Sequence, residues 1–219
     1  AALGSSHFEV TRVCFHEPQV GVVAMLPGVP RQVVLVHNVL KNTFTIVDQL
    51  QDATLALGFD SVIISAAFDP NRIGWNAKDQ EAFQNQQNSL GVDPTSRVLY
   101  YVGPHAPAVV ALIAPQPGFD HVSPSVTENT LVFAQAWPVS NRGRRALRKT
   151  AFLAYDLTTL RGGSGVVSEI TDKGLWSDRE QVVELRPTKA GSPSTVAFFE
   201  RDFAPGASVP FLRAGLIQL

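Results

Sequence analysis

The stretch QVVLVHNVLKNTFTIV, residues 32–47, sets the pattern from which the fold can be read. It contains two short apolar runs, 32–40 and 43–47, in which Val, Ile, Phe and Thr are the main residue types. These residues favour a strand over a helix, and the polar residues between the runs indicate a turn. We therefore predict two consecutive β-strands here.

Similar runs recur along the whole chain, and Gly, Pro, Asn or Asp occurs in nearly every gap between them. We predict further strands at residues 7–15, 20–26, 60–68, 96–103, 108–114, 129–137, 149–157, 164–170, 180–187, 194–203 and 208–217. About a dozen short strands at this spacing predict an all-β fold, an antiparallel β-barrel or sandwich.

Two segments depart from this pattern and give the fold one or two short helices. Residues 47–58 place Leu50, Thr54 and Leu57 on one helical face and end on Gly58, so we predict a short helix with a glycine C-cap. Residues 74–91 are the most polar stretch and form either a surface helix or a long excursion between strands. Neither a repeat nor a linker divides the chain, which we expect to be one domain over residues 1–219.

The composition narrows the class of protein. Charged residues make up 17% of the chain, below the roughly 25% usual for soluble domains. A surface of Ser, Thr, Asn, Gln and Pro is common in extracellular and virion-surface β-proteins. The only methionine is Met25, so we expect a processed product or an excised domain, with residues 1–6 a cloning remnant or a disordered terminus.

Several kinds of partner are not expected. No apolar run reaches the ~18 residues of a membrane span, so membrane insertion is not predicted. The net charge is -1, and the one basic run, residues 141–149, reads as a solvated loop, so nucleic-acid binding is not predicted either. The histidines lack chelating spacing, and no cofactor motif occurs, so we expect no metal and no cofactor. Cys14 lies in an alternating run and is expected to be a buried structural thiol.

The stretch RGGSG, residues 161–165, is the strongest candidate for catalysis. Ser164 could act as a nucleophile with His37 as its base, in the manner of a chymotrypsin-like hydrolase. However, His37 lies inside an apolar run, and the glycines fit a turn between two strands. We interpret RGGSG as a turn and predict no catalytic residue, and the hydrolase remains the alternative.

Tryptophans beside turns are the candidates for binding. Trp176 is followed by Ser177, Asp178 and Arg179, which combines a flat aromatic face with polar groups in a glycan-type arrangement. Trp75, followed by Asn76, lies beside a second turn. We predict receptor or glycan binding at these two places.

The order of segments in the second half resembles a known family. These segments are KTAFLAYDL, RGGSG, GLWSDRE, EQVVELRP, KAGSPS and STVAFFERDF, preceded by SRVLYYVGPHAP. Over roughly residues 95–205, this order is similar to the carboxy-terminal part of astrovirus capsid spikes, the projecting domain of the coat protein precursor.

The resemblance implies a β-barrel-like projecting domain that forms a homodimer on the virion and is not an enzyme. It also implies attachment to a host cell-surface receptor, for which a glycan is one candidate, and recognition by antibodies. We therefore expect a viral capsid spike domain on the virion surface. A secreted carbohydrate-binding β-sandwich is the other alternative, and a shell coat domain without its arm would look similar.

Overall fold

The computed structural model describes residues 8–28, 30–90, 97–104, 106–113, 115–127, 129–139, 147–158, 167–169, 181–187, 195–202 and 211–218. These residues form fifteen strands and one α-helix, all strand pairs being antiparallel. The all-β prediction is confirmed. The strands form a sandwich-like stack of open sheets, and no closed barrel occurs among the described residues.

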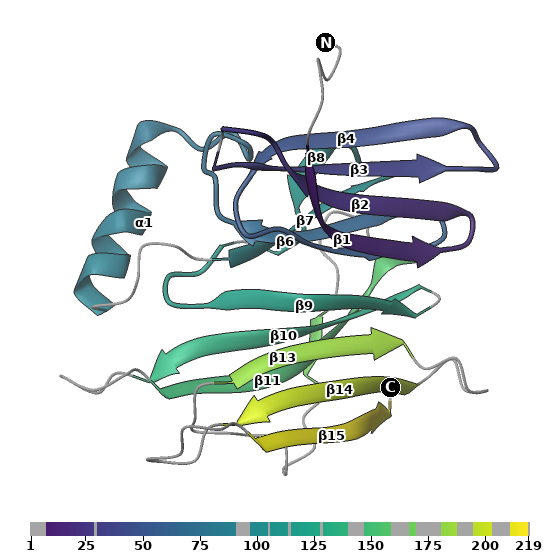
Figure 1. The fold of residues 1–219 in the computed structure, drawn as a ribbon. Helices are drawn as coiled ribbons and strands as arrows, with labels where there is room; N and C mark the ends of the chain where they lie inside the picture. The colour runs from purple at the N-terminus through teal and green to yellow at the C-terminus, as the bar shows by residue number, and fades with distance from the viewer. Residues whose placement is uncertain are drawn as a thin grey trace.

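Each sheet is built from strands that follow one another along the chain (Figure 1). The first sheet consists of β1 (Glu9–His16), β2 (Gln19–Met25), β3 (Gln32–Asn38) and β4 (Thr43–Leu50). The second consists of β5 (Thr54–Leu57), β6 (Val62–Ala67), β7 (Arg97–Gly103) and β8 (Ala106–Ala111). The third consists of β9 (Asp120–Thr127), β10 (Thr130–Val139), β11 (Leu147–Asp156) and β12 (Val167–Glu169). The fourth consists of β13 (Gln181–Pro187), β14 (Thr195–Asp202) and β15 (Phe211–Gln218).

The first and second sheets pack face to face through one hydrophobic cluster. Successive residues of a strand point to opposite faces, so alternate residues of β6 and β7 are directed to the first sheet. Ile64 and Tyr100 lie in this cluster with Val34 and Val36 of β3, and each of the four is at most 1% exposed. The interface therefore excludes water completely at its centre.

The other face of the second sheet packs on the third. Ile63 of β6 and Leu99 of β7 form a second cluster with Leu131 and Phe133 of β10 and Tyr155 of β11. Consequently β6 and β7 are covered on both faces, which fits their nearly continuous apolar sequences, VIISAA and RVLYYVG. The third layer continues toward β13, which lies beside β9 and β10 (Figure 1).

The strand predictions succeed where the sequence is strongly apolar, and every predicted strand overlaps a strand of the structure. The predicted helix over 47–58 is wrong. β4 continues to Leu50, the chain bends at Gln49 and Asp52, which both have positive φ, and β5 follows at Thr54–Leu57. Leu55 and Leu57 are 4% and 5% exposed because both pack into the cluster between the first and second sheets, and the intervening Ala56 packs on the third sheet.

Strand β9 was not predicted, because its sequence DHVSPSVT lacks a clear apolar alternation. Pro124 is tolerated there because β9 is an edge strand and the register shifts opposite residues 132–134. The helical alternative for residues 74–91 is confirmed by α1 (Ala77–Leu90), which stands at one side of the sheets (Figure 1).

Gly21 of β2 allows the first and second sheets to approach closely. A Cβ atom at this position would lie 2.5 Å from Leu55 Cδ2 and 3.2 Å from Leu57 Cδ1. Gly21→Ala is therefore expected to destabilise the protein by about 1–3 kcal/mol through overpacking. Chemical denaturation of the purified variant measures this loss.

Leu55→Ala should provide room for the new methyl group. In a double-mutant cycle, Gly21→Ala is expected to cost clearly less in the Leu55→Ala background than in the wild type. Strictly additive losses would show that the two sheets do not meet at Gly21.

Candidate functional site

Helix α1 begins directly after Asn76, whose side chain caps it. Asn76 Oδ1 accepts the backbone N–H groups of Lys78 at 2.9 Å and Asp79 at 3.1 Å. In return, Asp79 Oδ2 accepts the backbone N–H of Asn76 at 3.3 Å. This reciprocal arrangement is a capping box. It fixes where the helix begins and therefore where the preceding residue, Trp75, lies.

The indole ring of Trp75 belongs to a cluster of three aromatic side chains. Its centroid is 4.9 Å from that of Phe68 and 5.3 Å from that of Phe83, and the Phe68 and Phe83 centroids are 5.1 Å apart. All three contacts are edge-to-face, the geometry that aromatic pairs prefer. The backbone N–H of Trp75 donates to Pro70 O, and Gln80 Nε2 donates to Trp75 O, each at 3.1 Å. The position of the ring is therefore set by packing and by backbone contacts.

An open groove of about 380 Å³ lies beside this cluster. Its lining is shared between apolar side chains and polar groups, among them a carboxylate and an amide: Trp75, Asp79, Ala82, Phe83, Gln86 and Pro115. We call this feature the Trp75 groove. It combines a flat apolar surface with hydrogen-bonding groups, which is the chemistry of sites that bind small polar ligands.

The structure describes only part of the predicted binding residues. Trp75 lines the groove, whereas the side-chain oxygen of Asn76 caps α1. The second predicted place lies outside the described residues: Trp176, Ser177, Asp178 and Arg179. Binding at either place stays a prediction.

Most of the residues that line the Trp75 groove are not predicted as binding residues from the sequence. Asp79, Phe83 and Gln86 are three or four residues apart, so they share one face of α1, and helical periodicity could have indicated this. Pro115 comes from a distant loop and gives no local signal.

His37 lies on β3 and stacks on Phe44 of β4, with ring centroids 4.3 Å apart and an interplanar angle of 6°. Its Nε2 lies 3.3 Å from Asn42 Oδ1. Within the described ranges, His37 forms no ion pair with a carboxylate. Ser164 lies outside them. The orienting acid that a catalytic histidine requires is therefore not among its described contacts.

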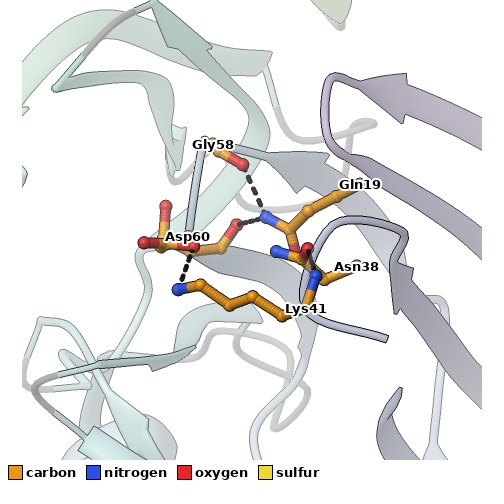
Figure 2. A network of polar contacts seen from close by, with 6 residues as sticks. Gln19, Asn38, Lys41, Gly58 and Asp60 are labelled. Carbon is orange, nitrogen blue, oxygen red and sulfur yellow. Dashed lines mark hydrogen bonds and ion pairs between the residues drawn. The ribbon is translucent and has the colours of Figure 1, made fainter. Parts of the chain in front are cut away.

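A cluster of polar side chains lies where the first and second sheets meet, and its hydrogen bonds and ion pair hold parts of the fold together (Figure 2). Gln19 is 4% exposed, and its Nε2 donates to Gly58 O at 2.5 Å and to Ser61 O at 3.2 Å. Lys41 Nζ lies 2.7 Å from Asp60 Oδ1. The Gln19 bonds connect the start of β2 with the turn before β6, and the Lys41–Asp60 pair connects the turn after β3 with the same turn. The buried amide bonds matter more than the ion pair, because an exposed pair contributes at most about 1 kcal/mol.

Cys14 also fits a structural role. It packs against the first core cluster, and its Sγ donates to Leu55 O at 3.2 Å. Burial raises the pKa of the thiol, and nearby Arg12 opposes this shift only in part, so the reactive thiolate is disfavoured.

No group of three or more His, Cys, Asp or Glu side chains suited to a metal ion occurs in the described part of the chain. Among the same residues, no helix has the length and apolar character needed to cross a bilayer.

The sequence matches no protein family and no curated protein. Among solved structures, an acylaminoacyl peptidase in complex with Z-Gly-Gly-Phe-chloromethyl ketone is similar with a TM-score of 0.50 and 6% identity. The match covers 96% of this chain and 31% of the peptidase chain. At this identity the likeness concerns the fold alone.

Two further structures match less well. A prolyl endopeptidase matches with a TM-score of 0.48 and 11% identity, over 94% of this chain and 27% of its own. The β-propeller domain of the trilobed protease from Pyrococcus furiosus matches with a TM-score of 0.44 and 9% identity, over 97% of this chain and 58% of its own. This chain thus spans less than a third of the length of the first two structures.

His121 is the most strongly perturbed titratable group of the described residues. It lies on β9, is 1% exposed and packs edge-to-face on Phe133 at 5.6 Å. The side-chain amide of Gln135 lies 3.4 Å from Nε2, and Nδ1 is buried without a hydrogen-bond partner among the described residues. Burial lowers the pKa of His121 to about 4, so the ring is neutral at pH 7.

Acidification is therefore expected to destabilise the fold through His121. Its pKa is about 4 when folded and about 6.5 when unfolded, so its contribution to stability is complete above about pH 6.5 and is lost as the pH falls toward 4. Between about pH 7 and about pH 5, the wild type should lose about 2 kcal/mol more than His121→Gln. Urea unfolding at both pH values measures the difference. Parallel pH profiles for the two proteins would contradict the assignment.

Proposed function

We propose that the chain is a non-enzymatic binding domain that attaches to a partner through the Trp75 groove. The observation that carries the proposal is the half-buried indole of Trp75, set by Phe68 and Phe83 and open to the groove. A rigid aromatic ring contributes a large contact area and loses little conformational freedom on binding. The groove volume of about 380 Å³ lies within the range of ligand sites, about 300–1,000 Å³.

The lining favours a sugar ring as the bound group. The apolar face of a pyranose can stack on an indole, while its hydroxyl groups need hydrogen-bond partners at the edge of the ring. Asp79 offers carboxylate oxygens, and Gln86 offers both a donor and an acceptor. A receptor glycan is therefore the ligand class that the groove suits best.

Attachment to a host cell-surface receptor from a virion is the more specific form of this proposal. It rests on the order of sequence segments over residues 95–205 and on the lysine-poor composition. Antibody recognition of the exposed loops would accompany such a role. The alternative, a secreted carbohydrate-binding domain, would bind sugar through the same groove but would not be part of a virion.

Absence of catalysis is part of the proposal. Its support is the environment of His37, which stacks on Phe44 and lies beside Asn42 on an exposed sheet face. Among the described residues, no carboxylate pairs with this ring to orient it as a general base.

The groove can be tested with oligosaccharides that end in galactose, N-acetylglucosamine or sialic acid. Saturation-transfer NMR is expected to detect binding of at least one of these groups to the wild type. Trp75→Ala should weaken this binding by about tenfold or more, because the stacking surface is lost. Phe59→Ala, at an exposed position of the β5–β6 turn, is the matched control and should bind normally.

Because Trp75 also packs on its neighbours, a second variant separates binding from folding. Gln86 is exposed, so Gln86→Ala should leave the fold intact. The variant should still bind the same sugar more weakly than the wild type. Absence of binding to all three sugar classes, or equal binding by wild type and both groove variants, would contradict the proposal.

A further inference from the structure

The outer face of the first sheet is apolar from one edge to the other. The strand register aligns Val13 of β1 with Val22 of β2, Val22 with Leu35 of β3, and Leu35 with Ile46 of β4. These four side chains form a continuous row across the sheet, on the face opposite to the core residue Val34.

A second row lies beside the first. Phe15 is aligned with Val20, Val20 with His37, and His37 with Phe44. The stacked rings of His37 and Phe44 complete this row at the β4 edge. No Lys, Arg, Asp or Glu occurs in either row. We call these two rows the outer face.

The outer face is exposed in this structure. Val13 is 65% exposed and Phe15 is 73% exposed at one edge, and Phe44 and Ile46 are 67% and 62% exposed at the other. The central residues of both rows are half-buried. A sheet that faces water on one side normally alternates apolar with polar residues, and that alternation is missing here.

The molecule itself shows what covers strands of this kind. β6 and β7 have the same nearly continuous apolar sequences, and each of their faces packs on another sheet of the chain. The sequence of β3, QVVLVHN, is of the same kind. Its inner face is covered and Val33 is buried, but Leu35 and His37 on the outer face are only half-buried. The outer face is therefore built to pack on another β-sheet.

We propose that this sheet is the first sheet of a second copy of the chain, so that two copies pack outer face on outer face. A two-fold contact places each patch against its own copy, which requires a self-complementary surface. Two uncharged apolar rows meet that requirement, and the net charge of -1 gives little repulsion between copies.

The size of the first sheet is compatible with such a contact. Its whole outer surface, of which the outer face is the apolar centre, has four strands about 4.8 Å apart with about seven residues of about 3.3 Å each, and projects to roughly 450 Å². Two such surfaces together give roughly 900 Å², close to the lower end of specific interfaces at about 1,000 Å². The outer face shares no residue with the Trp75 groove, so pairing would leave the groove open.

Light scattering on a sizing column tests the pairing with the full chain. The wild type is expected at about twice the chain mass of 23.7 kDa, and Ile46→Lys at the single-chain mass. Because Ile46 points away from the core, the variant should retain the circular dichroism spectrum of the wild type. Val13→Lys, at the opposite edge, should give the same result if Ile46→Lys does not fold.

Leu90→Lys is the matched control, because Leu90 is 54% exposed at the end of α1 and lies outside the outer face. It should remain a dimer. A wild type that stays monomeric up to about 100 µM, or a dimer that persists in both Ile46→Lys and Val13→Lys, would overturn the proposal.

Discussion

Burial of β6 and β7 on both faces is the constraint on which the remaining structure depends. Ile64 and Tyr100 are directed to the first sheet, and Ile63 and Leu99 to the third, and all four are fully buried. A strand that is apolar on both faces needs two partner sheets, and the chain supplies them from the segments before and after. Each sheet is made of consecutive strands, so the first three layers are stacked in the order in which the chain forms them.

The layered arrangement explains where polar chemistry can occur in this protein. The layers leave few polar groups inside the described part of the chain, and some of these are bonded across sheets, as Gln19 is to Gly58 O and Ser65 is to His121 O. His121 stays neutral because its surroundings are apolar. Binding chemistry is therefore expected at the sides of the stack, where α1 and its preceding loop place Trp75, and on sheet faces that remain uncovered.

The sequence predicts this fold to a considerable extent, for identifiable reasons. Strands such as β3 and β7 are recognisable because burial on two faces requires β-branched and aromatic residues in succession. The short strand β5 was mistaken for a helix because Leu50, Thr54 and Leu57 also satisfy a helical spacing, and tertiary contacts decide between the two. β9 was missed because it is an edge strand with a bulge at Ser123 and Pro124. Trp75 could be predicted as a candidate from its place beside a turn, whereas Pro115, which lines the same groove, comes from a segment far away in the sequence.

Amide hydrogen exchange resolved by strand tests the layered account most directly. If β6 and β7 form the doubly covered centre, their amides should exchange only on global unfolding, about a hundredfold more slowly than those of the edge strand β1. Exchange in β6 and β7 as fast as in β1 would show that the second sheet is not enclosed between its neighbours, and would contradict the account.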